Sequence, residues 1–365
     1  MQIKTLMGEE CNTTRSLWEE VFSEDSEKFL NYYYLWKAPW NIGYVIGEEP
    51  YEAMMFRTPY ELQIMDKKRS ISYLVAVATR KEFRHKGYMT ALLMEAFSQM
   101  YKEKNAFTFL MPANPAIYEP FDFSYVYERE VWELDKEWIQ ELEGCWNKEK
   151  EPISELKAAG SEAEYLKQLK IWEETNRCSL TSLKQDYHQK EKEKILQEIA
   201  DFANYWLLQK YQIYVCRTGE YYERQLEELM AQNGDIFIAK GKQGIEGIFL
   251  YAREEEDLSI QEVMEKREGL FSFLQKQEKK KPIIMARIIH AEEMLKLVKS
   301  KERRSLLIEI EDPLIPQNEG VYRWEMAPEG SSVIKLKEYR EPEESWHIRD
   351  LAPKILQKVF LNEIV

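Results

Sequence analysis

The chain is poor in the residues from which metal centres and disulfide frameworks are built. Among its 365 residues are only four histidines and four cysteines, Cys11, Cys145, Cys178 and Cys216. The cysteines lie far apart and lack the short spacings of zinc ligands. We therefore expect no metal and interpret the cysteines as structural thiols in a reducing compartment.

Several sequence signals of other protein classes are absent as well. The chain lacks the Gly-x-x-x-x-Gly-Lys-Ser/Thr loop of nucleoside triphosphatases and the Gly-x-Gly-x-x-Gly turn of dinucleotide-binding folds. No apolar run approaches the length of a membrane span, and the opening residues MQIKTLMGEE have no apolar signal-peptide core. These absences predict a cytoplasmic protein that does not enter a membrane.

Positive charge is also in deficit. The 51 Lys and Arg residues face 65 Asp and Glu residues, for a net charge of −14. Broad affinity for nucleic acid or anionic lipid relies on basic patches, so we expect neither as a partner. An acidic field attracts cationic substrates, although most of these glutamates are expected simply to cover solvated helices. The charge therefore permits an amine acceptor without identifying it.

The most informative segment that is present is 72–94, SYLVAVATRKEFRHKGYMTALLM. It runs from an apolar, β-branched strand into a basic turn that ends at Gly87, and then into an amphipathic helix. A phosphate group needs unobstructed backbone N–H donors, a helix N-terminus and nearby cations. Residues 84–89 could supply all three, although a basic turn before a helix is also common on solvated surfaces.

A second segment, 105–127, supports a catalytic interpretation. It predicts a strand over Phe107–Met111, a proline-bracketed loop and another strand, with Tyr118 in the loop. Together the two segments resemble the GNAT superfamily of N-acetyltransferases, in which Arg/Gln-x-x-Gly-x-Gly/Ala follows a Val-x-Val strand and a Tyr-x-x-x-Gly-Phe element comes later. Met89 and Asp122 depart from that pattern, because each stands where the family usually has a small residue. A helical N–H remains available at Met89, and Asp tolerates a left-handed backbone better than most residues.

The resemblance implies acetyl-CoA as cosubstrate and assigns residues to it. The backbone of Val75, Ala76 and Val77 would pair with the pantetheine amides. The CoA arm would pass Asn114. Six residues would surround the pyrophosphate: Arg84, His85, Lys86, Gly87, Tyr88 and Met89.

The rest of the chain predicts three parts with mixed α/β sheets. Residues 1–134 form the acetyltransferase domain, with a helix over 18–35 and strands at 44–46 and 53–55. Residues 135–280 begin with helices that extend to about residue 208, and His188 among them is expected to be a surface residue. The part continues with a helix over 222–230, a hairpin over 235–251 and a segment at 258–264. Since they carry no second basic turn, we interpret them as a degenerate second GNAT-like domain.

Residues 281–365 predict a separate α/β domain. Its expected elements are a strand at 282–289, a helix at 290–300, strands at 305–311, 320–326 and 332–337, and one or two helices over 346–360. This part resembles a sterol-carrier-protein-like domain. The three-part order resembles the enhanced intracellular survival (Eis) acetyltransferases, which assemble into rings of six, so a homo-oligomer is expected.

Acetyl transfer requires a neutral amine, yet only about one aliphatic amine in a thousand is neutral at pH 7. A base must therefore assist, and the departing thiolate benefits from a proton donor. The resemblance places Tyr118 as that acid. His85 belongs to the turn, and nothing marks His290 or His347 as catalytic. In the Eis group the terminal carboxylate is the base, which here is that of Val365, at the end of an apolar tail.

The acceptor is the least defined part of this reading. Asp25 and Trp36 could line a slot for a cationic amine, although both residue types are more often ordinary surface and core residues. An aminoglycoside-, polyamine- or lysine-like acceptor fits the resemblance. Two alternatives stay open: a non-catalytic acyl-CoA or lipid-binding protein, and a scaffold that no longer binds the cofactor.

Overall fold

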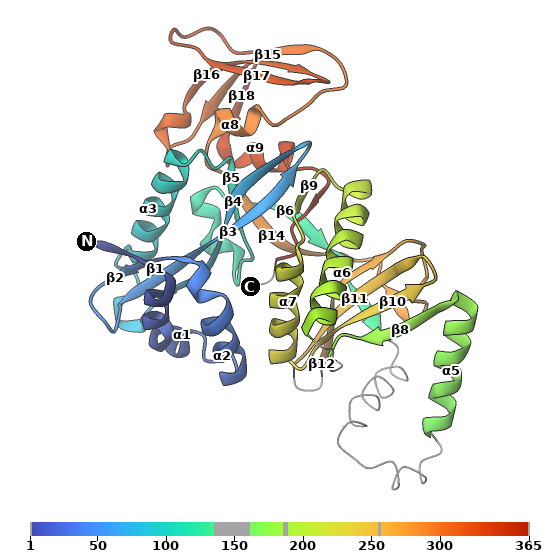
Figure 1. Ribbon diagram of the computed structural model, residues 1–365. Helices are drawn as coiled ribbons and strands as arrows, with labels where there is room; N and C mark the ends of the chain where they lie inside the picture. The colour runs from blue at the N-terminus through green and yellow to red at the C-terminus, as the bar shows by residue number, and fades with distance from the viewer. Residues whose placement is uncertain (1, 135–160, 185–188, 255–256, 364–365) are drawn as a thin grey trace. The chain divides into compact units, whose positions relative to one another are not determined.

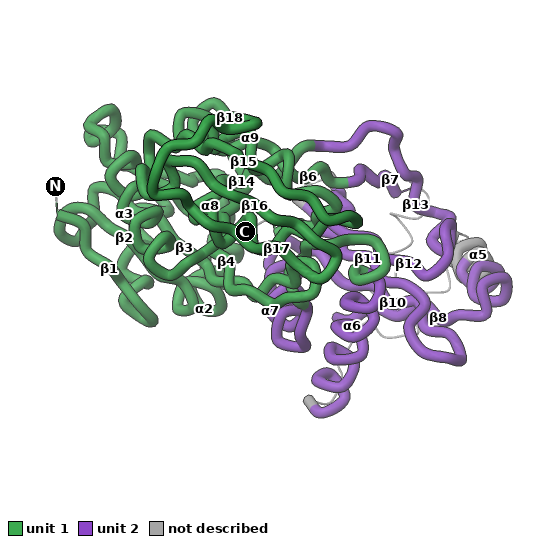
Figure 2. The backbone as a smooth tube through the Cα atoms, turned by 90° about the horizontal axis from the view of Figure 1, so that it is seen from above, with its two compact units in different colours: residues 1–129, 207–216, 282–365 green, residues 130–206, 217–281 purple. Residues whose placement is uncertain are grey.

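The computed structural model describes residues 2–134, 161–184, 189–254 and 257–363, and has the predicted mixed α/β class (Figure 1). The chain falls into two compact units (Figure 2). Unit 1 comprises residues 1–129, 207–216 and 282–365, and unit 2 comprises residues 130–206 and 217–281. No helix in the described ranges is long and apolar enough to cross a membrane.

A large twisted sheet forms the centre of unit 1. Its main path runs β1-β2-β3-β4-β5-β14-β6, β9 pairs with β3, and β19 pairs with β9. The strands are β1 (Ile3–Met7), β2 (Ile42–Ile46), β3 (Ala53–Ile64), β4 (Lys67–Thr79), β5 (Phe107–Leu110), β6 (Ser124–Arg129), β9 (Ile213–Val215), β14 (Lys281–Ile288) and β19 (Val359–Phe360). The strands predicted at 44–46 and 53–55 are confirmed.

The helices of unit 1 include the predicted helix after the basic turn. They are α1 (Arg15–Val21), α2 (Glu27–Trp36), α3 (Tyr88–Lys102), α8 (Ala291–Leu295) and α9 (Ile348–Ile355), with the short 3-10 turns η1 (Gly8–Thr14), η2 (Ala38–Trp40), η3 (Lys81–Phe83), η4 (Pro115–Ile117), η5 (Glu119–Phe121) and η7 (Pro316–Asn318). The single helix expected over 18–35 is wrong, since Ser26 caps a new helix by accepting a hydrogen bond from the Phe29 N–H at 3.1 Å. The buried face of α3, which includes Leu93 and Phe97, packs in one apolar cluster with sheet residues.

A second sheet in unit 1 has the order β17-β16-β15-β18. Its strands are β15 (Arg304–Glu311), β16 (Gly320–Ala327), β17 (Gly330–Lys335) and β18 (Glu344–His347). The three predicted strands of this region are therefore confirmed. The helix expected over 290–300 is shorter than predicted, and 346–360 is helical only in α9, because Trp346 and Val359–Phe360 join sheets instead.

The strand predicted at 282–289 is confirmed as β14, but its partner is unexpected. β14 pairs antiparallel with β5, placing Arg287 opposite Thr108. It lies between β5 and β6 in the sheet of the N-terminal part, and its residues from Ile283 onward are buried. A strand buried on both faces explains the apolar run. The division at 134 and 280 into three domains stays a prediction.

Unit 2 holds the remaining elements. A four-stranded sheet has the order β12-β11-β10-β8, and the short strands β7 and β13 pair with each other. Its elements are β7 (Trp132–Leu134), α5 (Ser161–Asn176), β8 (Cys178–Ser182), α6 (Gln189–Lys210, whose last turn belongs to unit 1), α7 (Gly219–Ala231), β10 (Asp235–Gly241), β11 (Gly244–Glu254), β12 (Asp257–Glu265) and β13 (Leu274–Lys276).

The predicted hairpin of unit 2 and the helix before it are confirmed. The helical prediction up to 208 is wrong at β8, which pairs with β10. Residues 135–160, with Cys145, and residue His188 lie outside the described residues. The interpretation of this part as a degenerate second copy stays a prediction.

Candidate functional site

The candidate site begins where β4 and β5 separate. β4 stays paired with β3 as far as Thr79, but its parallel pairing with β5 covers only Ser72 and Tyr73. Within the described strands, residues 74–79 therefore have no ladder partner on the β5 side. Backbone N–H and C=O groups at such an edge are available to an extended ligand that adds as a strand.

A β-bulge reshapes this open edge. Ala76 has a φ of 55°, and the β3–β4 register shifts because Ala76 and Val77 lie opposite the single residue Met55. A bulge turns the backbone groups of the strand and increases its local twist. Val75, Ala76 and Val77 thus lie at the open edge, and their pairing with pantetheine stays a prediction.

The basic turn follows directly from β4. Gly87 is the N-cap of α3 with a φ of 78°, and His85 also has a left-handed φ, of 61°. A Cβ added at Gly87 would meet no atom within 4 Å. Glycine is therefore required by the backbone conformation and not by crowding from the protein. Beyond it, the first N–H groups of the 15-residue helix α3, including those of Tyr88 and Met89, are oriented for an anion.

The cations of the turn divide into two groups. Arg80 is committed to the protein, because its Nε donates to the Tyr51 carbonyl at 2.7 Å and its guanidinium pairs with Glu20. Arg84, His85 and Lys86 are exposed, although the Arg84 Nε donates to the Thr79 carbonyl at 3.2 Å. Lys81 is exposed as well, and the contacts of Arg84, His85 and Lys86 with a pyrophosphate stay a prediction.

Met89 stands where the family pattern has a small residue. Its side chain is partly buried and packs against the apolar cluster of α3 and the sheet. Asn114 has a local role, because its Oδ1 caps η4 by accepting a hydrogen bond from the Ala116 N–H at 3.1 Å. Its predicted contact with CoA stays a prediction.

Tyr118 lies between η4 and η5, in the loop that continues from β5. Its ring makes an edge contact with Phe123 at 5.9 Å between centroids and packs against the cluster that contains α3. Burial raises the pKa of Tyr118 to about 12. The hydroxyl therefore keeps its proton at neutral pH, and it can donate a hydrogen bond.

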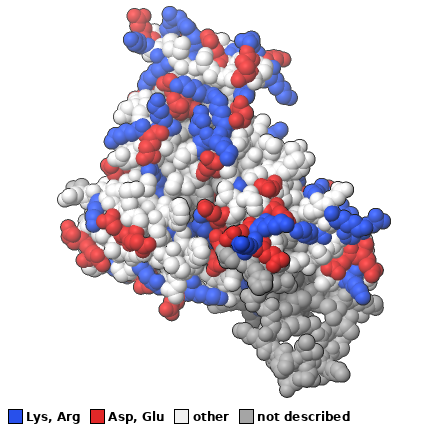
Figure 3. All heavy atoms as spheres, viewed as in Figure 1, with Lys and Arg blue, Asp and Glu red and all other residues white. Residues whose placement is uncertain are grey.

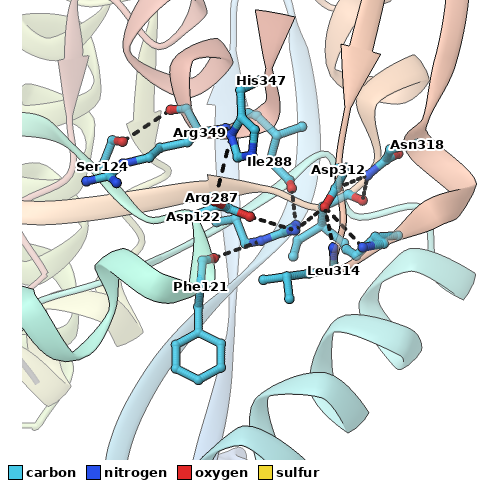
Figure 4. A network of polar contacts seen from close by, with 12 residues as sticks. Phe121, Asp122, Ser124, Arg287, Ile288, Asp312, Leu314, Asn318, His347 and Arg349 are labelled. Carbon is cyan, nitrogen blue, oxygen red and sulfur yellow. Dashed lines mark hydrogen bonds and ion pairs between the residues drawn. The ribbon is translucent and has the colours of Figure 1, made fainter.

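Asp122 adopts the left-handed conformation that its place in the pattern requires, with a φ of 63°. Its carboxylate lies 3.8 Å from the Arg287 guanidinium and 3.8 Å from the His347 imidazole (Figure 4). Sequence reasoning missed Arg287. The available signal was a charged residue inside the apolar strand Met285–Ile289, because a buried arginine requires partners.

The two predicted acceptor residues come from different elements from the turn. Asp25 lies between α1 and α2, where its Oδ2 accepts a hydrogen bond from the Trp18 indole N–H at 2.7 Å. Trp36 is the last residue of α2 and is half-buried. The indole contact orients the Asp25 carboxylate, and the acceptor role of both residues stays a prediction.

Val365 lies outside the described residues, but the chain before it is well placed. β19 joins the central sheet through β9, and the Phe360 ring lies 5.6 Å from that of Tyr127. Leu361, Asn362 and Glu363 are buried, the last with 3% of its surface exposed.

The described residues contain no group of three His, Cys, Asp or Glu side chains that could hold a metal ion. What they do contain is an open strand edge, an anion-binding helix start and a protonated tyrosine within one unit.

Comparison with known proteins agrees with this geometry. Residues 2–126 match the family model of an acetyltransferase (GNAT) domain. No curated protein matches the chain in sequence.

Solved structures resemble almost the whole chain. A probable N-acyltransferase of unknown function from Enterococcus faecalis has a TM-score of 0.72 at 15% identity, covering 98% of this chain and 90% of that one. A GCN5-related N-acetyltransferase from Anabaena variabilis has a TM-score of 0.66 at 15% identity, covering 96% and 89%. Eis1 from Mycobacterium abscessus has a TM-score of 0.64 at 10% identity, covering 98% and 90%.

At such identities the structural likeness establishes a shared fold, while the family match identifies the N-terminal part. Residues 2–126 therefore carry a GNAT acetyltransferase domain, and the chain as a whole shares the fold of these solved structures.

Proposed function

We propose that this enzyme transfers the acetyl group of acetyl-CoA to a primary amine by direct attack. The observation that carries the proposal is the separation of β4 from β5 at Tyr73, with the glycine-capped start of α3 at the end of one strand and Tyr118 after the other. A pantetheine arm that lies along residues 74–79 would bring its pyrophosphate to Gly87 and its thioester toward Tyr118.

In this arrangement the binding energy comes mainly from the backbone. Val75 and Val77 would pair with the pantetheine amides as a neighbouring strand does, with Ala76 shaping the edge. The N–H groups of residues 87–89 would bind the pyrophosphate, with Arg84 and Lys86 supplying positive charge and His85 lying beside them. Asn114 would approach the arm from the loop after β5.

The transfer itself needs a base that accepts one proton and a donor that stabilises the departing sulfur. The amine nitrogen attacks the thioester carbon, the C–S bond breaks, the sulfur leaves as a thiolate, and the new amide nitrogen loses one proton to a base. An ordinary thiol has a pKa of about 8.5, which lies below the raised pKa of Tyr118. Tyr118 therefore acts by donating a hydrogen bond to the developing thiolate, and complete proton transfer is not required for its effect.

We assign the base to the terminal carboxylate of Val365. The support is the burial of residues 361–363, because a terminus that is delivered to a reaction site must be held in place. This assignment makes the mechanism Eis-like, and it gives the sterol-carrier-protein-like segment the task of delivering the terminus rather than carrying a lipid.

The acceptor class is an aminoglycoside-, polyamine- or lysine-like amine. The net charge of −14 favours cations, and Asp25 and Trp36 would contact the acceptor. Figure 3 shows Lys and Arg side chains mixed with Asp and Glu side chains over the face in view, so surface charge alone selects no acceptor there. We further propose a cytoplasmic homo-oligomer, possessing six subunits as in the resembled group.

A thiol-release assay tests the proposal. Acetyl-CoA would be offered with polyamines, aminoglycosides and lysine peptides to the intact chain and to a chain lacking Ile364 and Val365. We expect turnover by the intact chain and its collapse on truncation. Turnover that survives truncation would remove Val365 from the mechanism, and CoA binding without turnover on any acceptor would refute the proposed reaction.

A further inference from the structure

A heavily constrained charged group of unit 1 lies next to the Tyr118 loop. Arg287 is fully buried on β14, and its guanidinium makes hydrogen bonds in three directions (Figure 4). Nη2 donates to Asp312 Oδ1 at 2.6 Å, Nη1 donates to the Ile288 carbonyl at 2.6 Å, and Nε donates to the Phe121 carbonyl at 3.0 Å. A buried arginine with this many partners has little freedom to move.

Asp312, the main partner of Arg287, is itself held rigidly. Its Oδ1 accepts hydrogen bonds from the backbone N–H groups of Leu314 and Ile315, and its Oδ2 accepts one from the Asn318 side chain at 2.8 Å. Both members of the pair are completely buried, so the attraction between them is weakly screened. The guanidinium is thereby a fixed point to which other segments can be attached.

The segment attached to this point is the loop that carries Tyr118. The Phe121 N–H donates to the Tyr118 carbonyl at 3.0 Å, and the Phe123 N–H reaches the same carbonyl at 3.4 Å. Holding the Phe121 carbonyl from one side therefore holds the turn that begins at Tyr118. The carboxylate of Asp122 adds a second attachment, since it lies between Arg287 and His347.

Arg287 also contacts the helix that begins at the basic turn. Its guanidinium lies 4.8 Å from the centre of the Phe97 ring in α3, and Phe97 in turn lies 6.2 Å from Phe123. One buried cation thus joins the helix that would bind the pyrophosphate to the loop that would meet the sulfur. Misplacement of a catalytic group by about 1 Å can cost about a hundredfold in rate.

We propose that Arg287 and Asp122 are positioning residues that hold the Tyr118 hydroxyl at the reacting sulfur. They touch neither substrate nor cofactor and act through the backbone of residues 118–123. The inference rests on the proposed function, because it takes Tyr118 to be the hydrogen-bond donor. It also gives a purpose to an aspartate at a left-handed position where the family usually has glycine: its carboxylate attaches the loop to a strand from the far end of the chain.

A double-mutant cycle in the full-length enzyme tests this inference. We expect Arg287→Lys, which keeps the charge but loses the fork, to lower kcat about tenfold to a hundredfold, with the KM for acetyl-CoA nearly unchanged. In a Tyr118→Phe background the same substitution should change kcat by less than about twofold, because residues that act through one group are not additive.

The matched control is Arg57→Lys. Arg57 is another buried arginine of unit 1, paired in a fork with Glu103 at 2.9 Å through both Nη atoms, and it lies on β3 outside the proposed site. It should lower stability while leaving kcat unchanged in either background. If Arg287→Lys does not fold, Asp122→Asn enters the same cycle, since it removes the carboxylate charge with little change of shape.

The outcomes separate the inference from the function on which it rests. If Tyr118→Phe lowers kcat but the effect of Arg287→Lys multiplies with it, or Arg287→Lys has no effect on kcat, the positioning role is overturned and the acid role stands. If Tyr118→Phe leaves kcat unchanged, the proposed donor itself fails, and the positioning role fails with it.

Discussion

Replacing Gly87 with alanine should damage cofactor binding far more than folding. The φ of 78° places this residue in the left-handed region, where a Cβ costs about 1–2 kcal/mol. Because the added Cβ would meet no protein atom within 4 Å, no steric cost adds to this figure. For a unit of this size, we expect the melting temperature to fall by about 2–4 °C for each kcal/mol.

The effect on CoA should be larger because the space beside Gly87 is where the pyrophosphate would approach. Losing one hydrogen bond to a charged group costs about 1.5–3 kcal/mol, which corresponds to roughly a tenfold to hundredfold rise in Kd. Isothermal titration with CoA measures the change in Kd, and thermal unfolding followed by circular dichroism measures the fall in melting temperature.

Gly269 provides a closely matched control. It has a φ of 77° and also leaves an added Cβ without a neighbour within 4 Å, but it lies in a turn of unit 2. Gly269→Ala should therefore destabilise to a similar extent and leave the Kd for CoA unchanged. Equal affinities of the two variants for CoA would refute the assignment of the pyrophosphate to Gly87.

Three further predictions concern other residues. Tyr118→Phe should lower kcat about a hundredfold while the KM for acetyl-CoA changes little. The activity of the unmodified protein should not decline between pH 9 and 10, because burial keeps the pKa of Tyr118 near 12 and the donor stays protonated. A loss of activity at the ordinary pKa of tyrosine that the phenylalanine variant does not show would contradict this. A fragment of residues 1–129 should lack a cooperative thermal transition, since β5 and β6 lose the strand between them; a sharp melting curve for the fragment would show that β14 is dispensable. Burial raises the pKa of Asp235 to about 6 despite hydrogen bonds from Ser182 and the Ile236 N–H, so the folded protein binds this proton more tightly than the unfolded chain does, and the free energy of unfolding falls as pH rises from about 4 through 6. Asp235→Asn should therefore raise the free energy of unfolding, measured in urea, by on the order of 2–3 kcal/mol at pH 7 and by almost nothing at pH 4. A gain that is the same at both pH values would contradict this cause.

The parts of the site that are local in sequence could be predicted from the sequence. The strand before Thr79, the glycine at the N-cap of α3 and the tyrosine loop after β5 each follow from residues within one turn or strand. These parts depend on backbone conformations, such as the left-handed φ at Gly87, that few residue types adopt, so the residue type itself indicates them.

The parts that depend on distant pairing could not be predicted. The apolar run of β14 fits any buried sheet equally well, so nothing near residue 287 indicates that its partner is Thr108. The same reason explains why β8 was expected to be helical and why Val359–Phe360 was expected to continue a helix. The role proposed for Arg287 depends on that pairing, so the sequence alone does not indicate it.

The place of β14 in the sheet has a consequence for how the protein is made. A ribosome must synthesise residues 130–281, which include all of unit 2, before the strand that lies between β5 and β6 is complete. Until then the nascent acetyltransferase sheet presents two unpaired strand edges, which are sites of intermolecular pairing. We therefore expect unit 2 to fold first on the ribosome. We also expect the yield of correctly folded protein to depend on how long the edges of β5 and β6 stay unpaired.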